Sequence, residues 1–222
     1  CVLRSRADFW QGARPPFALQ RGLCNTMAKL YFRYGAMNSG KSTALMQVAY
    51  NYEERGMRVL VMKPSVDTKG GDKLVSRLGV TRLVDILDLV KDLLTRAPAP
   101  ACILTDESQF FTPEQVEQLL RITVELNIPV IAYGLRTDFS LKGFPGSTRL
   151  LELAHAVEEM KTICFCGRKA TCNGRKVNGE FVFEGDQVVI DQGGDVEYVS
   201  LCAQCYFRER EDFYRRHPRI TV

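Results

Sequence analysis

The chain has 222 residues, of which 45% are hydrophobic and 25% are charged, a composition that excludes a disordered or fibrous protein. It contains no apolar run long enough to span a membrane, so no membrane partner is expected. Of its net charge of +4, residues 1–26 hold +3 through four arginines and one aspartate. The near-neutral remainder lacks the basic surface that would indicate a nucleic-acid partner.

The first 26 residues differ in character from the rest. They include the Pro15-Pro16 pair, show no sustained periodicity and lack the apolar core of a secretory signal. Met27 follows, directly before an apolar segment. We interpret residues 1–26 as a non-native or disordered N-terminal extension. The alternative is an organelle transit peptide, which the arginine content favours and the single serine, Ser5, disfavours.

From residue 29 to residue 135, strand-like and helix-like patterns alternate. The predicted strands are 29–34, 58–63, 102–105 and 129–135, and the predicted helices are 41–55, about 86–94 and a segment that starts at residue 112. This alternation predicts an α/β fold in which helices cover both faces of a parallel sheet. We assign residues 27–160 to this domain.

Local signals set the expected limits of these elements. Gly56 is expected to close the first helix, and Pro64 to stop the second strand. The third helix is expected to begin with a capping box formed by Thr112 and Gln115. The polar stretch 65–82 contains two adjacent glycines and is expected to form a mobile loop.

Residues 35–42 match the pattern G-x-x-x-x-G-K-[ST], between a predicted strand and a predicted helix. In that context the glycines let backbone N–H groups surround phosphate oxygens, the lysine reaches the β- and γ-phosphates, and the hydroxyl binds Mg²⁺. We therefore predict an ATP-binding loop with Mg²⁺ as cofactor. Its residues are Gly35, Ala36, Met37, Asn38, Ser39, Gly40, Lys41 and Ser42.

Two carboxylates follow the strand 102–105. At the carboxyl end of a parallel strand, Asp106 is expected to hold Mg²⁺ directly or through water. Glu107 is expected to act as general base on an attacking hydroxyl or water. Gln109 is assigned with the ATP and Mg²⁺ group. The carboxylates alone leave open whether the acceptor is water or an alcohol.

Beyond residue 160 the sequence changes to short β-type segments between glycines and cysteines, followed by a charged helix. Two cysteine pairs offer four thiolates for a structural Zn²⁺ site. The first pair is C-x-C rather than C-x-x-C, Cys172 is a spare thiol, and unligated thiols are the alternative. We assign 161–207 to a small zinc-stapled domain and 208–222 to a C-terminal helix or tail. The predicted ligands are Cys164, Cys166, Cys202 and Cys205.

Taken together, these residues resemble the type II thymidine kinases, a zinc-containing family with a P-loop and a lasso loop. The resemblance runs from Met27 to about Phe207, and the C-x-C pair is similar to that of some bacterial members. It rests on residues 30–43, 51–58, 106–110, 133–139, 162–170 and 198–202.

The resemblance implies transfer of the γ-phosphoryl group of ATP to the 5′-hydroxyl of thymidine, with Glu107 as the base. It also implies a lasso over 188–198 that covers the thymine, a cytoplasmic homotetramer and feedback inhibition by dTTP. The implied substrate-binding residues are Met37, Phe110, Leu135, Phe139, Phe144, Val189, Ile190 and Tyr198.

Two departures from the family pattern leave details open. The stretch 190–194 is slightly longer than the family's lasso, and Lys69 stands where an arginine is expected near the transferred phosphate. Lys69 and Arg77 are both candidates for the assisting cation, and we commit to neither. A nucleic-acid-dependent P-loop ATPase with a zinc ribbon is the rival function, and a homologue that binds nucleotide without turnover is a third.

Overall fold

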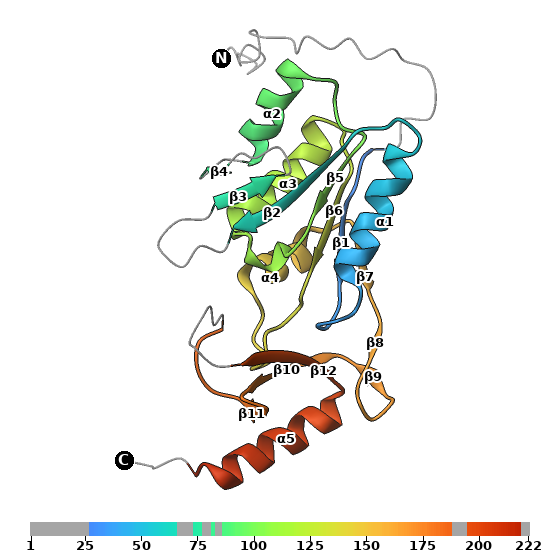
Figure 1. The fold of residues 1–222 in the computed structure, drawn as a ribbon. Coiled ribbons are helices and arrows are strands. Elements are labelled where there is room, and N and C mark those ends of the chain that lie inside the picture. The colour runs from blue at the N-terminus through green and yellow to red at the C-terminus, as the bar shows by residue number, and fades with distance from the viewer. Residues whose placement is uncertain (1–26, 66–72, 77–80, 83–85, 188–194, 219–222) are drawn as a thin grey trace, which may run out of the picture.

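A computed structural model describes residues 27–65, 73–76, 81–82, 86–187 and 195–218. Figure 1 shows a large sheet flanked by helices, and a small sheet with one helix at the end of the large one. The predicted N-terminal extension, 1–26, lies outside the described residues. In the part of the chain that is described, none of the helices is both long and apolar enough to cross a bilayer.

The large sheet confirms the predicted α/β fold. Its strand order is β4-β3-β2-β5-β6-β1-β7, and the five strands from β2 to β7 pair in parallel. The edge strands β3 and β4 are antiparallel additions. The strands are β1 (Leu30–Tyr34), β2 (Val59–Ser65), β3 (Lys73–Ser76), β4 (Thr81–Arg82), β5 (Cys102–Thr105), β6 (Val130–Gly134) and β7 (Ala156–Glu159).

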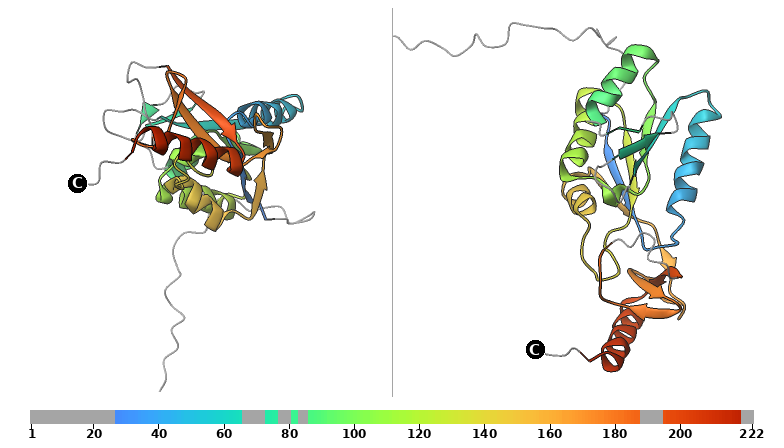
Figure 2. Two further views of the ribbon diagram at one scale, coloured as in Figure 1. Left: turned by 90° about the horizontal axis from the view of Figure 1, so that it is seen from below. Right: turned by 60° about the vertical axis from the view of Figure 1, so that its left-hand side comes forward.

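Helices cover both faces of this sheet, as the right-hand view of Figure 2 shows. One face packs α1 (Lys41–Glu53) through Leu45 and Ala49 onto Leu104. The other packs α2 (Ile86–Arg96) and α3 (Pro113–Glu125) onto strand residues such as Ile103. Neighbouring strand residues thus enter opposite cores, which explains the continuous apolar run of β5. The short helix η1 (Ser108–Phe110) and α4 (Pro145–Leu153) complete this part.

The small sheet is antiparallel, in the order β11-β10-β12. Its core joins the four-cysteine region to an aromatic cluster of Phe183, Tyr206 and Phe213. The elements are the hairpin β8 (Thr162–Ile163) and β9 (Lys169–Ala170), the sheet strands β10 (Cys172–Val177), β11 (Glu180–Val182) and β12 (Val196–Leu201), and the helix α5 (Ala203–Arg216).

Two of the expected element limits are confirmed. Gly56, at φ 72°, follows α1 and donates to Glu53 O, while the Met57 N–H reaches Tyr52 O, which is the hydrogen-bond pattern of a Schellman motif. At α3, Thr112 and Gln115 form the predicted reciprocal capping box.

Two other expectations are wrong. Strand β2 continues through Pro64 to Ser65. Its parallel register with β5 ends at Met62, and beyond that point a missing proline N–H is tolerated. The stretch expected to be a loop contains β3 and β4, which extend the sheet in antiparallel register; its other residues, 66–72 and 77–80, lie outside the description.

The cap of α3 offers a test of the local energetics. Thr112→Ala removes the acceptor for the Gln115 N–H and is expected to lower the free energy of unfolding by about 1 kcal/mol. Denaturant unfolding measures this loss. Thr95→Ala, at an exposed position on α2, is the matched control and should change stability by only a few tenths of a kcal/mol. Equal effects of both changes would contradict the cap assignment.

Candidate active site

The loop between β1 and α1 has the conformation that its glycines predict. A Cβ at Gly35 would lie 2.6 Å from Met160 O, so only glycine fits there. Gly40 has φ 75° and precedes the first residue of α1. The amino end of the helix therefore points at the loop and supplies partial positive charge and free N–H groups for an anion.

Two side chains at the end of this loop, Lys41 and Ser42, lie close to the carboxylate of Asp106. Lys41 Nζ donates to Ala36 O at 2.8 Å, which keeps the ammonium inside the curve of the loop. Burial lowers the pKa of Lys41, and the nearby charges of Glu107 and Asp106 oppose this shift. Ser42 Oγ donates to Asp106 Oδ2 at 3.0 Å. This hydroxyl and carboxylate are oxygen ligands of the kind that Mg²⁺ binds, so the residues fit the predicted ion.

Glu107 adopts a backbone conformation that is unfavourable for a residue with a side chain. Its φ of 52° and ψ of 37° lie in the left-handed region, which costs about 1–2 kcal/mol. The side chain is held by Gln109, whose Nε2 donates to Glu107 Oε2 at 2.5 Å. Gln109 Oε1 in turn accepts the Leu135 N–H at 3.0 Å. The predicted contact of Gln109 with ATP or Mg²⁺ stays a prediction.

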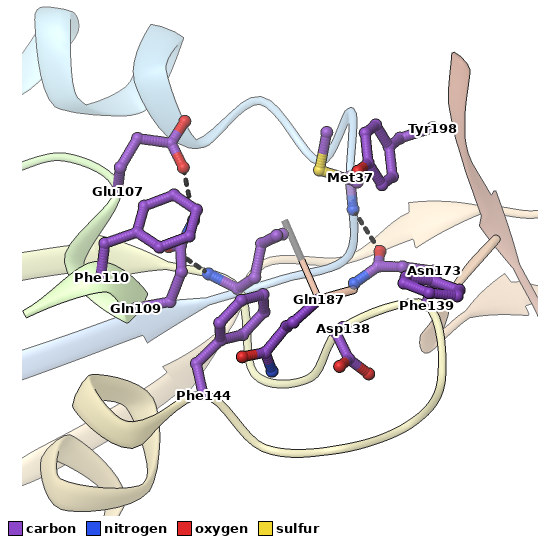
Figure 3. Close-up of a pocket in the computed structure, with 11 residues that line it drawn as sticks. Met37, Glu107, Gln109, Phe110, Asp138, Phe139, Phe144, Asn173, Gln187 and Tyr198 are labelled. Atoms are coloured by element: carbon purple, nitrogen blue, oxygen red, sulfur yellow. Dashed lines mark hydrogen bonds between the residues drawn. The ribbon is translucent and has the colours of Figure 1, made fainter. Parts of the chain in front are cut away.

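A cavity of about 170 Å³ opens beside Glu107. Figure 3 shows Phe110 and Phe144 on one side and Met37 and Tyr198 on the other. Its lining is mainly apolar with a few polar groups, which suits a small planar ligand. The lining residues are Met37, Glu107, Gln109, Phe110, Leu135, Asp138, Phe139, Phe144, Asn173, Gln187 and Tyr198.

The cavity brings together six of the eight residues that the resemblance implied for substrate binding. The other two, Val189 and Ile190, lie outside the described residues. Asp138, Asn173 and Gln187 were not predicted. Asp138 follows a predicted strand and could have been found by the strand-end rule, whereas nothing in the local sequence distinguishes Asn173 or Gln187.

Asn173, on β10, joins the predicted ATP-binding loop of residues 35–42, the phosphate loop, to the cavity. Its Oδ1 accepts the Met37 N–H at 2.8 Å, and its Nδ2 donates to Thr137 O at 2.7 Å. Ser200, on β12, donates to Met37 O. The small sheet therefore contacts the phosphate loop directly, and Met37 belongs to both the loop and the cavity wall.

The four predicted cysteine ligands form one group. Their Sγ atoms all lie within 4.8 Å of one another, and Cys166 Sγ is 3.6 Å from Cys202 Sγ. A tetrahedral site with Zn–S bonds of about 2.3 Å requires sulfur separations of about 3.8 Å, so the group fits zinc. The Cys205 N–H donates to Cys202 Sγ and lowers the pKa of that thiol, which favours its thiolate, whereas burial raises the pKa of Cys205. Cys172 is not in the group.

Comparison with known proteins identifies the family. A family model described as thymidine kinase matches residues 28–206. A thymidine kinase of Legionella pneumophila is 49% identical over 191 residues, which cover 82% of this chain and 90% of that protein. Those of Chromobacterium violaceum and Ruegeria pomeroyi are 48% and 47% identical and also cover 82% of this chain, with 100% and 95% of their own lengths aligned.

Among solved structures, Bacteroides Pif1 bound to ssDNA matches 60% of this chain and 38% of its own, with a TM-score of 0.35 and 14% identity. That likeness is too distant to bear on function. The family match covers most of the chain, and the sequence identities extend over nearly the whole length of the bacterial enzymes. This chain therefore belongs to the thymidine kinase family.

Proposed function

We propose that the protein transfers the γ-phosphoryl group of ATP to the 5′-hydroxyl of thymidine. The observation that carries this proposal is the position of Glu107. Its carboxylate lines the cavity and also acts electrostatically on Lys41 in the phosphate loop. A group that faces both a nucleoside pocket and a triphosphate loop is suited to act where the two substrates react.

In this proposal Glu107 accepts the proton of the 5′-hydroxyl while the oxygen attacks the γ-phosphorus, and the bond from that phosphorus to the β-phosphate oxygen breaks to release ADP. Lys41 and the backbone N–H groups of the loop stabilise the charge on the phosphate oxygens. Ser42 and Asp106 would hold Mg²⁺, which neutralises charge on the β- and γ-phosphates when bound. The Gln109 hydrogen bond orients the Glu107 carboxylate before substrate arrives.

We assign the zinc ion a structural role. The four thiols connect the β8–β9 hairpin to the first turn of α5, because Cys164 and Cys166 lie in the hairpin turn and Cys202 caps the helix. Structural zinc contributes on the order of 10 kcal/mol to the folding of small domains. Such a link would keep β10 and β12, which carry Asn173 and Tyr198, in place at the cavity.

Further parts of the proposal extend beyond the site. We propose a cytoplasmic homotetramer inhibited by dTTP, supported by the family membership. The domain limits 27–160 and 161–207, the base contacts of Val189 and Ile190, and a role for Lys69 or Arg77 belong to the same proposal.

The role of Glu107 is tested by Glu107→Gln, which keeps the shape of the side chain but removes its capacity to accept a proton. Turnover with labelled ATP, Mg²⁺ and thymidine is expected to fall by about 10²- to 10⁴-fold, while ATP binding is retained. Glu54→Gln, at an exposed position just after α1, is the matched control and should act like the wild type. Unchanged turnover in Glu107→Gln would remove Glu107 as the base.

Metal analysis tests the zinc assignment. The purified protein should contain about one zinc ion per chain, as a four-thiolate site requires. Cys205→Ser should lose the metal and lower the unfolding temperature, whereas Cys172→Ser, outside the four-thiol group, should retain both. Zinc loss in Cys172→Ser, with retention in Cys205→Ser, would instead make Cys172 a ligand.

A further inference from the structure

Arg175 is a buried cation that the proposed reaction does not use. It lies on β10 and is only 3% exposed. Its guanidinium carbon is 3.7 Å from the centroid of the Phe139 ring. Its Nε atom is buried and makes no hydrogen bond in the described part of the chain. Burying a charged group costs free energy unless the group is paired and hydrogen-bonded. The contacts that hold Arg175 in place therefore need an explanation.

The other two nitrogens of Arg175 hold a turn of the backbone. Nη1 donates to Asp186 O at 2.8 Å and Nη2 donates to Glu184 O at 2.5 Å. Between them Gly185 has φ 104°, and a Cβ there would lie 2.9 Å from Nη2. The chain therefore closes tightly around the guanidinium. The next residue after this turn is Gln187, which lines the cavity.

Phe139, the residue under the guanidinium, is fixed at its backbone as well. Its carbonyl accepts a hydrogen bond of 2.8 Å from Tyr206 Oη on α5. The preceding residue, Asp138, accepts the N–H groups of Ser140 and Lys142, each at 2.8 Å, which fixes the turn from which Phe139 projects. The ring and the backbone of Phe139 are thus held by separate groups of the small sheet and its helix.

We infer that Arg175 and Tyr206 are positioning residues for the nucleoside pocket. They act through Phe139, and Arg175 also acts through the turn that carries Gln187. The inference rests on the proposed function, because it takes the cavity as the nucleoside site. Phe139 and Gln187 both line that cavity, so fixing them before binding removes an entropic cost that the nucleoside would otherwise meet. Neither Phe139 nor Gln187 belongs to the phosphate loop. Loss of these contacts should therefore weaken the binding of thymidine and leave the binding of ATP unchanged.

The test uses Arg175→Met, which keeps an unbranched apolar side chain but loses the cation and both hydrogen bonds. The KM for thymidine is expected to rise about tenfold, with kcat and the KM for ATP unchanged within about twofold. Arg175→Lys restores the charge above the ring but not the paired donors, so it should recover part of the affinity. Zinc content should remain at the wild-type level in both variants.

The matched control is Lys176→Met, in the next residue of β10. Lys176 also lies over an aromatic ring, at 5.0 Å from the centroid of Phe181, and within 3.9 Å of Glu197, but it points to the other face of the strand. This variant should keep both KM values. An increase in the thymidine KM equal to that of Arg175→Met would reduce the role of Arg175 to general stability of the sheet.

Tyr206→Phe keeps the test decisive if the Arg175 variants fail to fold. It removes only the hydroxyl that reaches Phe139 O, and the thymidine KM should rise about threefold to tenfold. Unchanged thymidine KM in folded variants at both positions would overturn the inference while the proposed function stands. A wild-type protein that phosphorylates no nucleoside would instead overturn the proposed function itself.

Discussion

The hydrogen bond from the Met37 N–H to Asn173 Oδ1 is the contact on which the site depends. The phosphate loop belongs to the large parallel sheet, whereas Asn173 and Tyr198 belong to the small antiparallel one. Neither sheet alone encloses the cavity. Because the amide nitrogen Nδ2 of Asn173 donates to Thr137 O, one buried side chain fixes the distance between the loop, the cavity wall and the small sheet. Loss of the Asn173 side chain would leave its buried polar partners unpaired, which would lower the free energy of unfolding.

Around this contact three residues are held in energetically unfavourable states. Glu107 keeps a left-handed backbone, Lys41 is held partly away from water, and Arg175 is buried against a ring. Such strain is stable only when surrounding groups over-determine it. Here each unfavourable group is held by hydrogen bonds to its surroundings: Glu107 by the Gln109 amide, Lys41 by Ala36 O, and Arg175 by two backbone carbonyls.

Much of the site could be predicted because its signals are local. The loop residues Lys41 and Ser42 follow from a motif, and Asp106 and Glu107 follow from the end of an apolar strand. Asn173 and Arg175 could not be found in this way, because no local pattern connects them to what they contact. Asn173 is 136 residues from Met37 in the chain, and the ring under Arg175 belongs to Phe139, on a different segment. The extension of β2 through Pro64 was missed for a related reason, since the tolerance of proline depends on where the neighbouring strand ends.

In the proposed reaction the phosphoryl group passes directly from ATP in the loop to the 5′-hydroxyl of thymidine beside Glu107. The stereochemical course at phosphorus tests this most directly. ATP with an isotopically chiral γ-phosphoryl group would be converted with thymidine, and the configuration of the product determined. A single in-line displacement predicts inversion at phosphorus. Retention would require a phosphorylated protein intermediate and would contradict direct transfer between two substrates held in one cleft.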